Sequence, residues 1–165
     1  MLADWIGLLL SNFGFAMFLV AVFFMLLNRL VTRGRVPQYE IVYRWIALFP
    51  VGVTGVYTFV MHVFYPDISA ATIGWSPSPF QYEVGIADLG FGVLAILSFN
   101  ASYGFRLATT LGNTVWLWGD AIGHIHQIIA QQNFSSGNAG TWFWMDIFMP
   151  VIMLLCILKL RRTRA

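Results

Sequence analysis

The sequence predicts an all-α fold, a polytopic transmembrane bundle of five helices that forms a single domain over residues 1–165. Hydrophobic residues make up 59% of the chain and charged residues only 10%, whereas a soluble domain carries roughly 25% charged residues. A chain of this composition cannot cover a water-facing surface. Five of its segments are close to the roughly 20 mostly apolar residues that a helix needs to cross a bilayer core.

The first three spans are predicted at about 5–30, 41–64 and 81–98. No basic region or small-residue cleavage site accompanies the first apolar run, so we expect a retained helix rather than a removed signal peptide. Pro50 is expected to break the regular hydrogen bonding near the middle of the second span. A loop with three prolines, at 65–80, leads to the third span.

The last two spans are predicted at about 105–131 and 140–160. The connections before them, NASYG and QNFSSGN, contain the Gly, Ser and Asn residues that are typical of breaks between helices. Pro150 lies inside the fifth span and is expected to displace the carbonyl group four residues earlier, which belongs to Asp146.

All nine Lys and Arg residues fall on one side of this five-span arrangement: Arg29, Arg33, Arg35, Arg44, Arg106, Lys159, Arg161, Arg162 and Arg164. The opposite side carries Asp4 and Asp67 instead. Because cytoplasmic loops of membrane proteins are enriched in Lys and Arg, we expect the N-terminus outside and the C-terminus in the cytoplasm.

Polar residues form a narrow stripe along the fourth span. With successive residues about 100° apart, six of them share one face of the helix: Arg106, Asn113, Asp120, His124, Gln127 and Gln131. A charge deep in the bilayer costs several kcal/mol unless it is paired, protonated or solvated, so this face is not expected to contact lipid. His126 lies about 120° from the stripe and is not expected to share a site with His124.

Three neighbours of the stripe carry further expectations. Gly119 and Gly123 are spaced as a GxxxG pair, which lets another helix approach closely. The indole N–H of Trp116 is expected to find a hydrogen-bond partner at the border of the stripe. Trp75, in the loop at 65–80, marks the membrane interface or serves as a lid.

Ionisable residues from three spans are predicted to meet in the outer half of the bilayer. The main hypothesis is a site for a metal ion or another cation, formed by Asp120, His124, Asp146, Glu83 and Asp88. Mixed oxygen and nitrogen ligands of this kind suit a divalent or transition metal ion. Glu83 and Asp88 are about 140° apart on a helix, so both cannot point straight at one neighbour. No catalytic or cofactor-binding residue can be assigned, and an enzyme of this kind would be metal-dependent.

Two other functions stay open. A small transporter or proton-coupled binding protein would use the stripe to line a cavity. A structural or assembly subunit would use the same polar groups as hydrogen bonds between helices. The expected partners are the lipid bilayer and either a second copy of the chain or other subunits of a membrane complex. No basic patch with interleaved aromatic residues indicates a nucleic-acid partner.

Four stretches together resemble a known family: SPFQYEVGIADLGFGVLAIL, GDAIGHIHQ, SGNAG and MDIFMP. The family consists of small multi-pass membrane proteins of bacteria and archaea and is known only as a domain of unknown function. The resemblance covers about the last 90 residues, which include the third, fourth and fifth predicted spans. It implies a protein of the bacterial cytoplasmic (inner) membrane, and it implies no activity.

Overall fold

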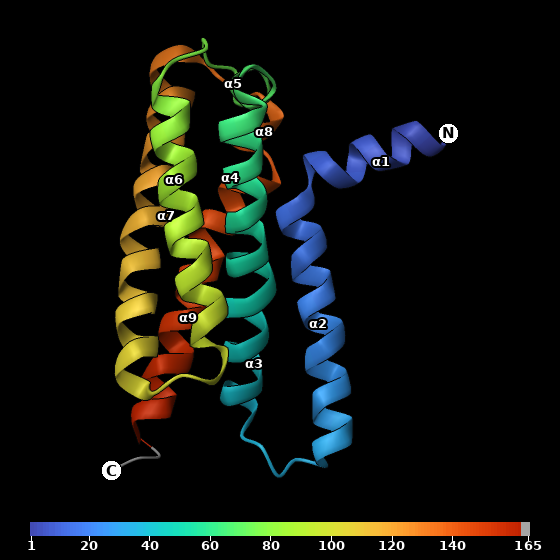
Figure 1. Cartoon of the computed structure of the whole chain (residues 1–165), viewed down its shortest axis with the longest axis vertical. Coiled ribbons are helices and arrows are strands. Elements are labelled where there is room, and N and C mark those ends of the chain that lie inside the picture. Colours follow the sequence, from blue (N-terminus) through green and yellow to red (C-terminus); the bar gives the residue numbers. More distant parts are fainter. Residues whose placement is uncertain (163–165) are drawn as a thin grey trace.

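The computed structural model shows a bundle of helices joined by short connections (Figure 1). It describes residues 1–162, with side chains described for Met1 and residues 5–160. No strand occurs in this part of the chain, so the all-α prediction is confirmed. In chain order the elements are α1 (Leu2–Ser11), α2 (Phe13–Thr32), α3 (Gln38–Ile46), the π-helix η1 (Ala47–Val53), α4 (Thr54–Phe64), α5 (Pro66–Ile73), α6 (Phe80–Leu97), the 3₁₀-helix η2 (Ser98–Asn100), α7 (Tyr103–Gln131), α8 (Ser136–Ala139) and α9 (Thr141–Arg162).

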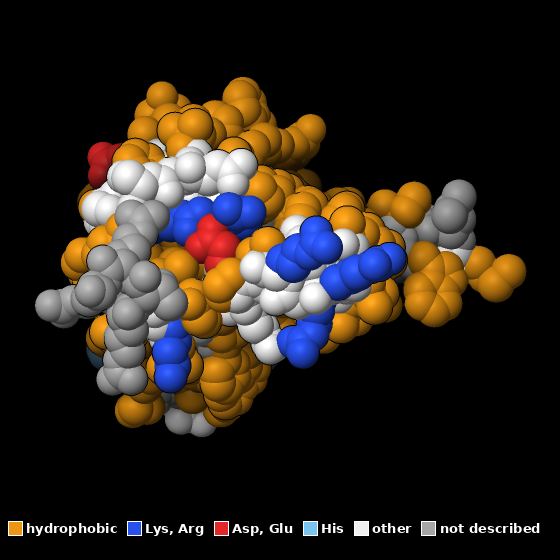
Figure 2. All heavy atoms as spheres, turned by 90° about the horizontal axis from the view of Figure 1, so that it is seen from below, with side chains coloured by type: hydrophobic (Ala, Val, Ile, Leu, Met, Phe, Trp, Pro, Cys, Tyr) orange, Lys and Arg blue, Asp and Glu red, His pale blue; other side chains and the backbone are white. Residues whose placement is uncertain are grey.

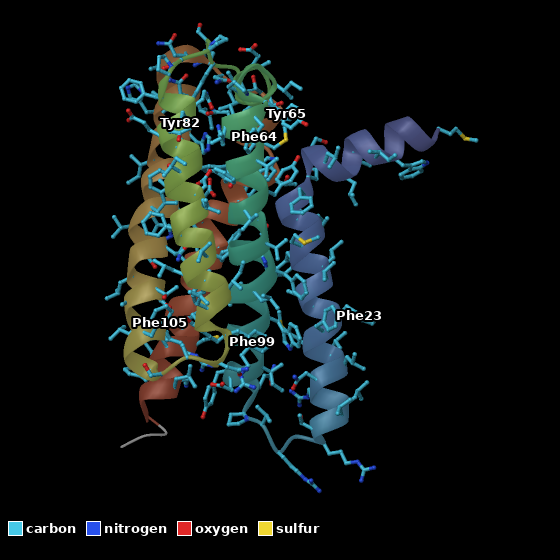
Figure 3. All side chains as sticks on the ribbon, viewed as in Figure 1. Phe23, Phe64, Tyr65, Tyr82, Phe99 and Phe105 are labelled. Carbon is cyan, nitrogen blue, oxygen red and sulfur yellow. The ribbon has the colours of Figure 1, made fainter. Side chains whose placement is uncertain are left out.

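Four segments of the described chain are long and apolar enough to cross a membrane: Phe13–Thr32, Gln38–Phe64, Phe80–Asn100 and Ser136–Leu160. The 29-residue α7 runs beside them (Figure 1). It is long enough to cross a membrane, but it carries many polar side chains and is not among these four apolar segments. The surface of the bundle is apolar, and Phe23, Phe64 and Tyr82 are each more than half exposed (Figure 3). The chain is therefore a helical membrane protein, while the fifth crossing and the orientation stay predictions.

The first predicted span is not one helix. α1 ends at Ser11, α2 begins after Asn12, and α1 points away from the bundle (Figure 1). At this α1–α2 elbow, the backbone oxygens of the last two α1 residues accept hydrogen bonds from the Tyr57 hydroxyl (2.9 Å) and the Trp142 indole (2.8 Å). Hydrogen bonds to other helices thus hold the break, and the apolar character of the run does not reveal it.

Prolines shape the second span and the connection after it. The π-helix η1 surrounds Pro50 and runs on into α3 and α4 without interruption, so the predicted irregularity is confirmed. The segment predicted as a loop at 65–80 contains the helix α5, so the prediction of a loop over its whole length is wrong. Pro66 occupies the first turn of α5, where its fixed φ favours a helix, and Gly74 ends the helix with a φ of 80°.

The bundle contains two closely packed helix pairs: α4 packs along α6, and α7 packs along α9. Glycines bring α4 and α6 together. A Cβ atom at Gly92 would lie 2.9 Å from the backbone oxygen of Gly52, and a Cβ atom at Gly55 would lie 2.8 Å from the backbone oxygen of Asp88. The two backbones are therefore in contact over this stretch.

The two helix pairs meet at the end of the bundle that carries the basic residues. There α3 and η1 pack against α9, and Tyr43, Ala95 and Met153 are fully buried in a shared core. Toward the other end, the described chain forms no corresponding core cluster between the two pairs. The cavity described below lies between them.

A buried ion-pair cluster lies at the basic end of the bundle. Arg106 is 3% exposed, and its guanidinium donates to the backbone oxygens of Ser98 (2.9 Å) and Phe99 (2.6 Å) and to the Glu40 carboxylate (2.7 Å). The other Glu40 oxygen contacts Arg44 at 2.7 Å. Figure 2 shows Lys and Arg side chains gathered at this end around an acidic side chain.

Candidate functional site

A cavity of about 780 Å³ lies between the two helix pairs. Its walls come from α4, α6, α7 and α9, with further contributions from α1, α5 and η1. Most of the lining is apolar, but three carboxylates and two imidazoles also face it: Asp88, Asp120, Asp146, His62 and His124. Acidic and histidine side chains from separate helices therefore line one cavity.

His124 is held in one orientation by Asn138. The Asn138 amide nitrogen donates to the backbone oxygens of His124 (3.3 Å) and Asn133 (2.8 Å), so its side-chain oxygen must be the atom that faces His124 Nδ1 at 2.7 Å. Nδ1 is consequently the N–H donor of the imidazole, an assignment made from the hydrogen-bond network. The other ring nitrogen, Nε2, lies 3.6 Å from Asp146 Oδ2.

We predict that Asn138→Ala destabilises the protein by about 1–3 kcal/mol. The substitution leaves the buried Nδ1–H of His124 and two backbone oxygens without their partner. Chemical unfolding in mixed micelles measures the effect. As a control, Asn100→Ala changes an exposed asparagine outside the cavity and is expected to stay within about 0.5 kcal/mol of the parent. Equal effects of the two substitutions would contradict the role given to Asn138.

The two other carboxylates of the cavity differ in their partners. Asp88 Oδ1 accepts a hydrogen bond from the Trp116 indole at 3.0 Å, which confirms the expected partner for Trp116. The Trp116 ring also stacks on Phe91, with centroids 5.5 Å apart. No side chain among residues 5–160 hydrogen-bonds to the Asp120 carboxylate, although this carboxylate lines the cavity. Asp120 is thus free to receive a ligand.

Glu83 lies outside this cavity, and its role as a ligand stays a prediction. Its side chain is exposed and lines no part of the cavity, whereas Asp88, on the same helix, faces inward. The angular separation of the two residues explains the difference, because α6 is a regular helix here. His126 is also exposed, in agreement with its predicted position away from His124.

The polar stripe of α7 is divided among three environments. Asn113 reaches the inner part of the cavity, beyond Asp120 and His124. Arg106 lies outside the cavity, in the ion-pair cluster at the basic end. Gln127 and Gln131 line a separate, more polar pocket of about 510 Å³ together with Trp75, which also borders the cavity. One face of a helix can therefore serve several sites along its length.

The predicted metal centre is not supported by the geometry. Among the residues with described side chains, no group of three or more His, Cys, Asp or Glu residues is placed to hold a metal ion. His124 and Asp146 are close to each other, but two ligands fall short of the four that structural zinc sites use and of the three protein ligands of catalytic ones. The binding of a metal here stays a prediction.

Three residues of these networks were not predicted as site residues from the sequence: His62, Asn138 and Glu40. The His62 ring Nδ1 hydrogen-bonds to Gln81 Oε1 while the side chain lines the cavity. Asn138 sits in a connection rich in Ser, Gly and Asn, where an asparagine looks like an ordinary turn residue. An acidic residue at the start of a span next to several arginines is the one signal that could have indicated Glu40.

Comparison with known proteins identifies a family but no activity. A family model described as a family of unknown function (DUF6790) matches residues 11–165. No curated protein and no solved structure matches the chain. The matched region contains the cavity-lining residues of α4, α6, α7 and α9.

Proposed function

Since the chain belongs to this family of unknown function, we propose its function from its geometry: it is a membrane protein that binds a positively charged organic ligand in the cavity between the two helix pairs. The observation that carries the proposal is the lining of that cavity. Asp88, Asp120 and Asp146 face it, and no Lys or Arg does so among the described residues. Carboxylates at this depth call for a cationic partner or for protonation.

The size and the walls of the cavity favour an organic cation over a bare ion. A volume of about 780 Å³ falls within the roughly 300–1,000 Å³ of typical small-molecule sites. Apolar side chains such as Leu117, Met145 and Met149 form much of the wall, and they would contact the hydrocarbon part of a ligand. An amine that carries a short alkyl group combines both requirements.

We also propose that the cavity opens on the extracytoplasmic side of the membrane. The support is the distribution of charge, since the cavity lies away from the bundle end that carries the Arg and Lys residues. By the enrichment of basic residues in cytoplasmic loops, that basic end would face the cytoplasm. The ligand would then come from outside the cell or from the outer leaflet.

The test measures the binding of butylammonium to the protein in lipid nanodiscs by calorimetry. Asp120→Asn keeps the shape of the side chain but removes its charge. We expect it to weaken binding about tenfold to a hundredfold, because a hydrogen bond to a charged group contributes about 1.5–3 kcal/mol. Asp146→Asn is expected to act in the same direction.

Glu83→Gln is the matched control, since it removes an exposed carboxylate outside the cavity and should leave the affinity unchanged. Failure of the wild type to bind butylammonium, or equal affinity in the folded Asp120→Asn variant, would overturn the proposal. A sharp fall in melting temperature for Asp120→Asn and His124→Gln, with no binding by the wild type, would favour a structural subunit instead.

A further inference from the structure

We infer that the ligand is a membrane-dissolved amphiphile, an alkylammonium whose chain enters the cavity sideways from the bilayer between α6 and α7. This inference rests on the proposed function and adds a ligand class and a route. It depends on which sides of the cavity are closed by packing and which side is not.

The side of the cavity between α4 and α9 is closed by the α1–α2 elbow. Besides the hydrogen bonds of Tyr57 and Trp142 to the backbone of α1, Thr141 Oγ1 donates to Asn12 Oδ1 at 2.9 Å. The ring of Phe13 stacks on Tyr57 with centroids 4.1 Å apart. Bonds from both α4 and α9 thus hold the elbow across this gap.

The side between α6 and α7 is packed at its inner end. There the Phe91 ring stacks on Trp116, and a Cβ atom at Gly112 would lie 3.1 Å from the same ring. About two and three turns farther along α7 than Gly112, Gly119 and Gly123 line the cavity, and a Cβ atom at either would meet no atom within 4 Å. The close helix contact predicted for this GxxxG pair is therefore wrong, and space stands in its place.

The two glycines also lie at the boundary between the lipid-facing and cavity-facing sides of α7. Going round the helix from Asp120, Gly123 comes after about 60° and Gly119 after about 100°. Val115 and Ile122, which are 77% and 67% exposed, lie farther round in the same direction. On the opposite lip, Val84 and Asp88 of α6 line the cavity. The opening therefore joins an apolar outer surface directly to two carboxylates.

This arrangement fits a ligand with two unlike ends. The ammonium group would lie between Asp88 and Asp120, and the alkyl chain would pass over the glycines into the surrounding hydrocarbon. A side chain at Gly119 or Gly123 would occupy the space that the alkyl chain needs. The short butylammonium depends less on that space, because its alkyl group does not reach the bilayer from a cavity of this size.

The experiment compares radiolabelled dodecylammonium with butylammonium on protein in nanodiscs, after subtraction of the dodecylammonium that dissolves in empty nanodiscs. In the variant Gly119→Phe with Gly123→Phe, we expect dodecylammonium affinity to fall about tenfold or more, and to fall at least about fivefold more than butylammonium affinity does. Gly90→Phe is the matched control, because Gly90 is an exposed helical glycine with no atom near an added Cβ and lies outside the cavity. It should change neither affinity.

The outcomes distinguish the route of entry from the binding site itself. Unchanged dodecylammonium binding in the double variant would overturn entry between α6 and α7, while the proposed site for the ammonium group would stand. Equal losses for both probes would overturn it as well, since the glycines would then shape the cavity itself. If the wild type binds neither probe, the proposed function and this inference fall together.

Discussion

Replacing Arg106 with methionine is expected to lower the free energy of unfolding by about 3–5 kcal/mol, the largest loss we predict for a single side chain outside the cavity. The guanidinium is almost fully buried, and its donors satisfy two backbone oxygens and the Glu40 carboxylate. Methionine fills a similar volume but leaves all three acceptors without this partner. Since a typical domain is stable by only about 5–15 kcal/mol, unfolding in mixed micelles will show the change clearly.

Two further variants separate charge from hydrogen-bond geometry at this position. Arg106→Lys keeps the positive charge but loses the planar fork of donors, and we expect an intermediate loss of about 1–3 kcal/mol. Arg29→Met removes a basic residue whose side chain, among the described residues, bonds only to the exposed Gln38, and it should cost less than about 1 kcal/mol. A loss below that limit for Arg106→Met would show that the buried cluster contributes little to stability.

The helical architecture could be predicted from the sequence because it depends on local properties. Apolar runs of bilayer length placed the second to fifth helices close to their observed bounds, and Pro50 marked the irregular turn of η1. The break at Asn12 could not be found in this way. It is held by hydrogen bonds from Tyr57 and Trp142, and these residues are distant in the chain.

The sequence predicted which side chains of the candidate site share a helix face, but it did not predict the distances between the helices. Helical periodicity correctly put Asp120 and His124 on one side of α7 and separated Glu83 from Asp88. Periodicity does not tell how far apart two helices stand. The sequence offered glycines on α4, α6 and α7 alike, but Gly55 on α4 and Gly92 on α6 meet another backbone closely, and no glycine on α7 does so within the described chain. The carboxylates therefore surround a cavity instead of sharing one ion.

Replacing Gly92 with leucine is expected to have the second large effect, a loss of about 3 kcal/mol or more. Overpacking a well-packed interior costs typically 1–3 kcal/mol and occasionally more, and here the obstacle is rigid. A Cβ atom at Gly92 would lie 2.9 Å from the Gly52 backbone oxygen and 3.1 Å from the Gly55 Cα atom. Backbone atoms cannot turn aside as a side chain can, so α4 and α6 must separate.

Gly90→Leu provides the comparison for Gly92→Leu, since it adds the same side chain two residues earlier, where an added Cβ meets nothing within 4 Å. Its stability should stay within about 0.5 kcal/mol of the parent, and Gly92→Ala gives a milder version if the leucine variant does not fold.

Because the Asp88 backbone lies against Gly55 in the same contact, separating α4 from α6 also moves Asp88. Gly92→Ala should therefore weaken butylammonium binding while Gly90→Leu does not. Equal stability and equal binding in the two variants would show that this glycine contact neither holds the helix pair together nor positions the carboxylate.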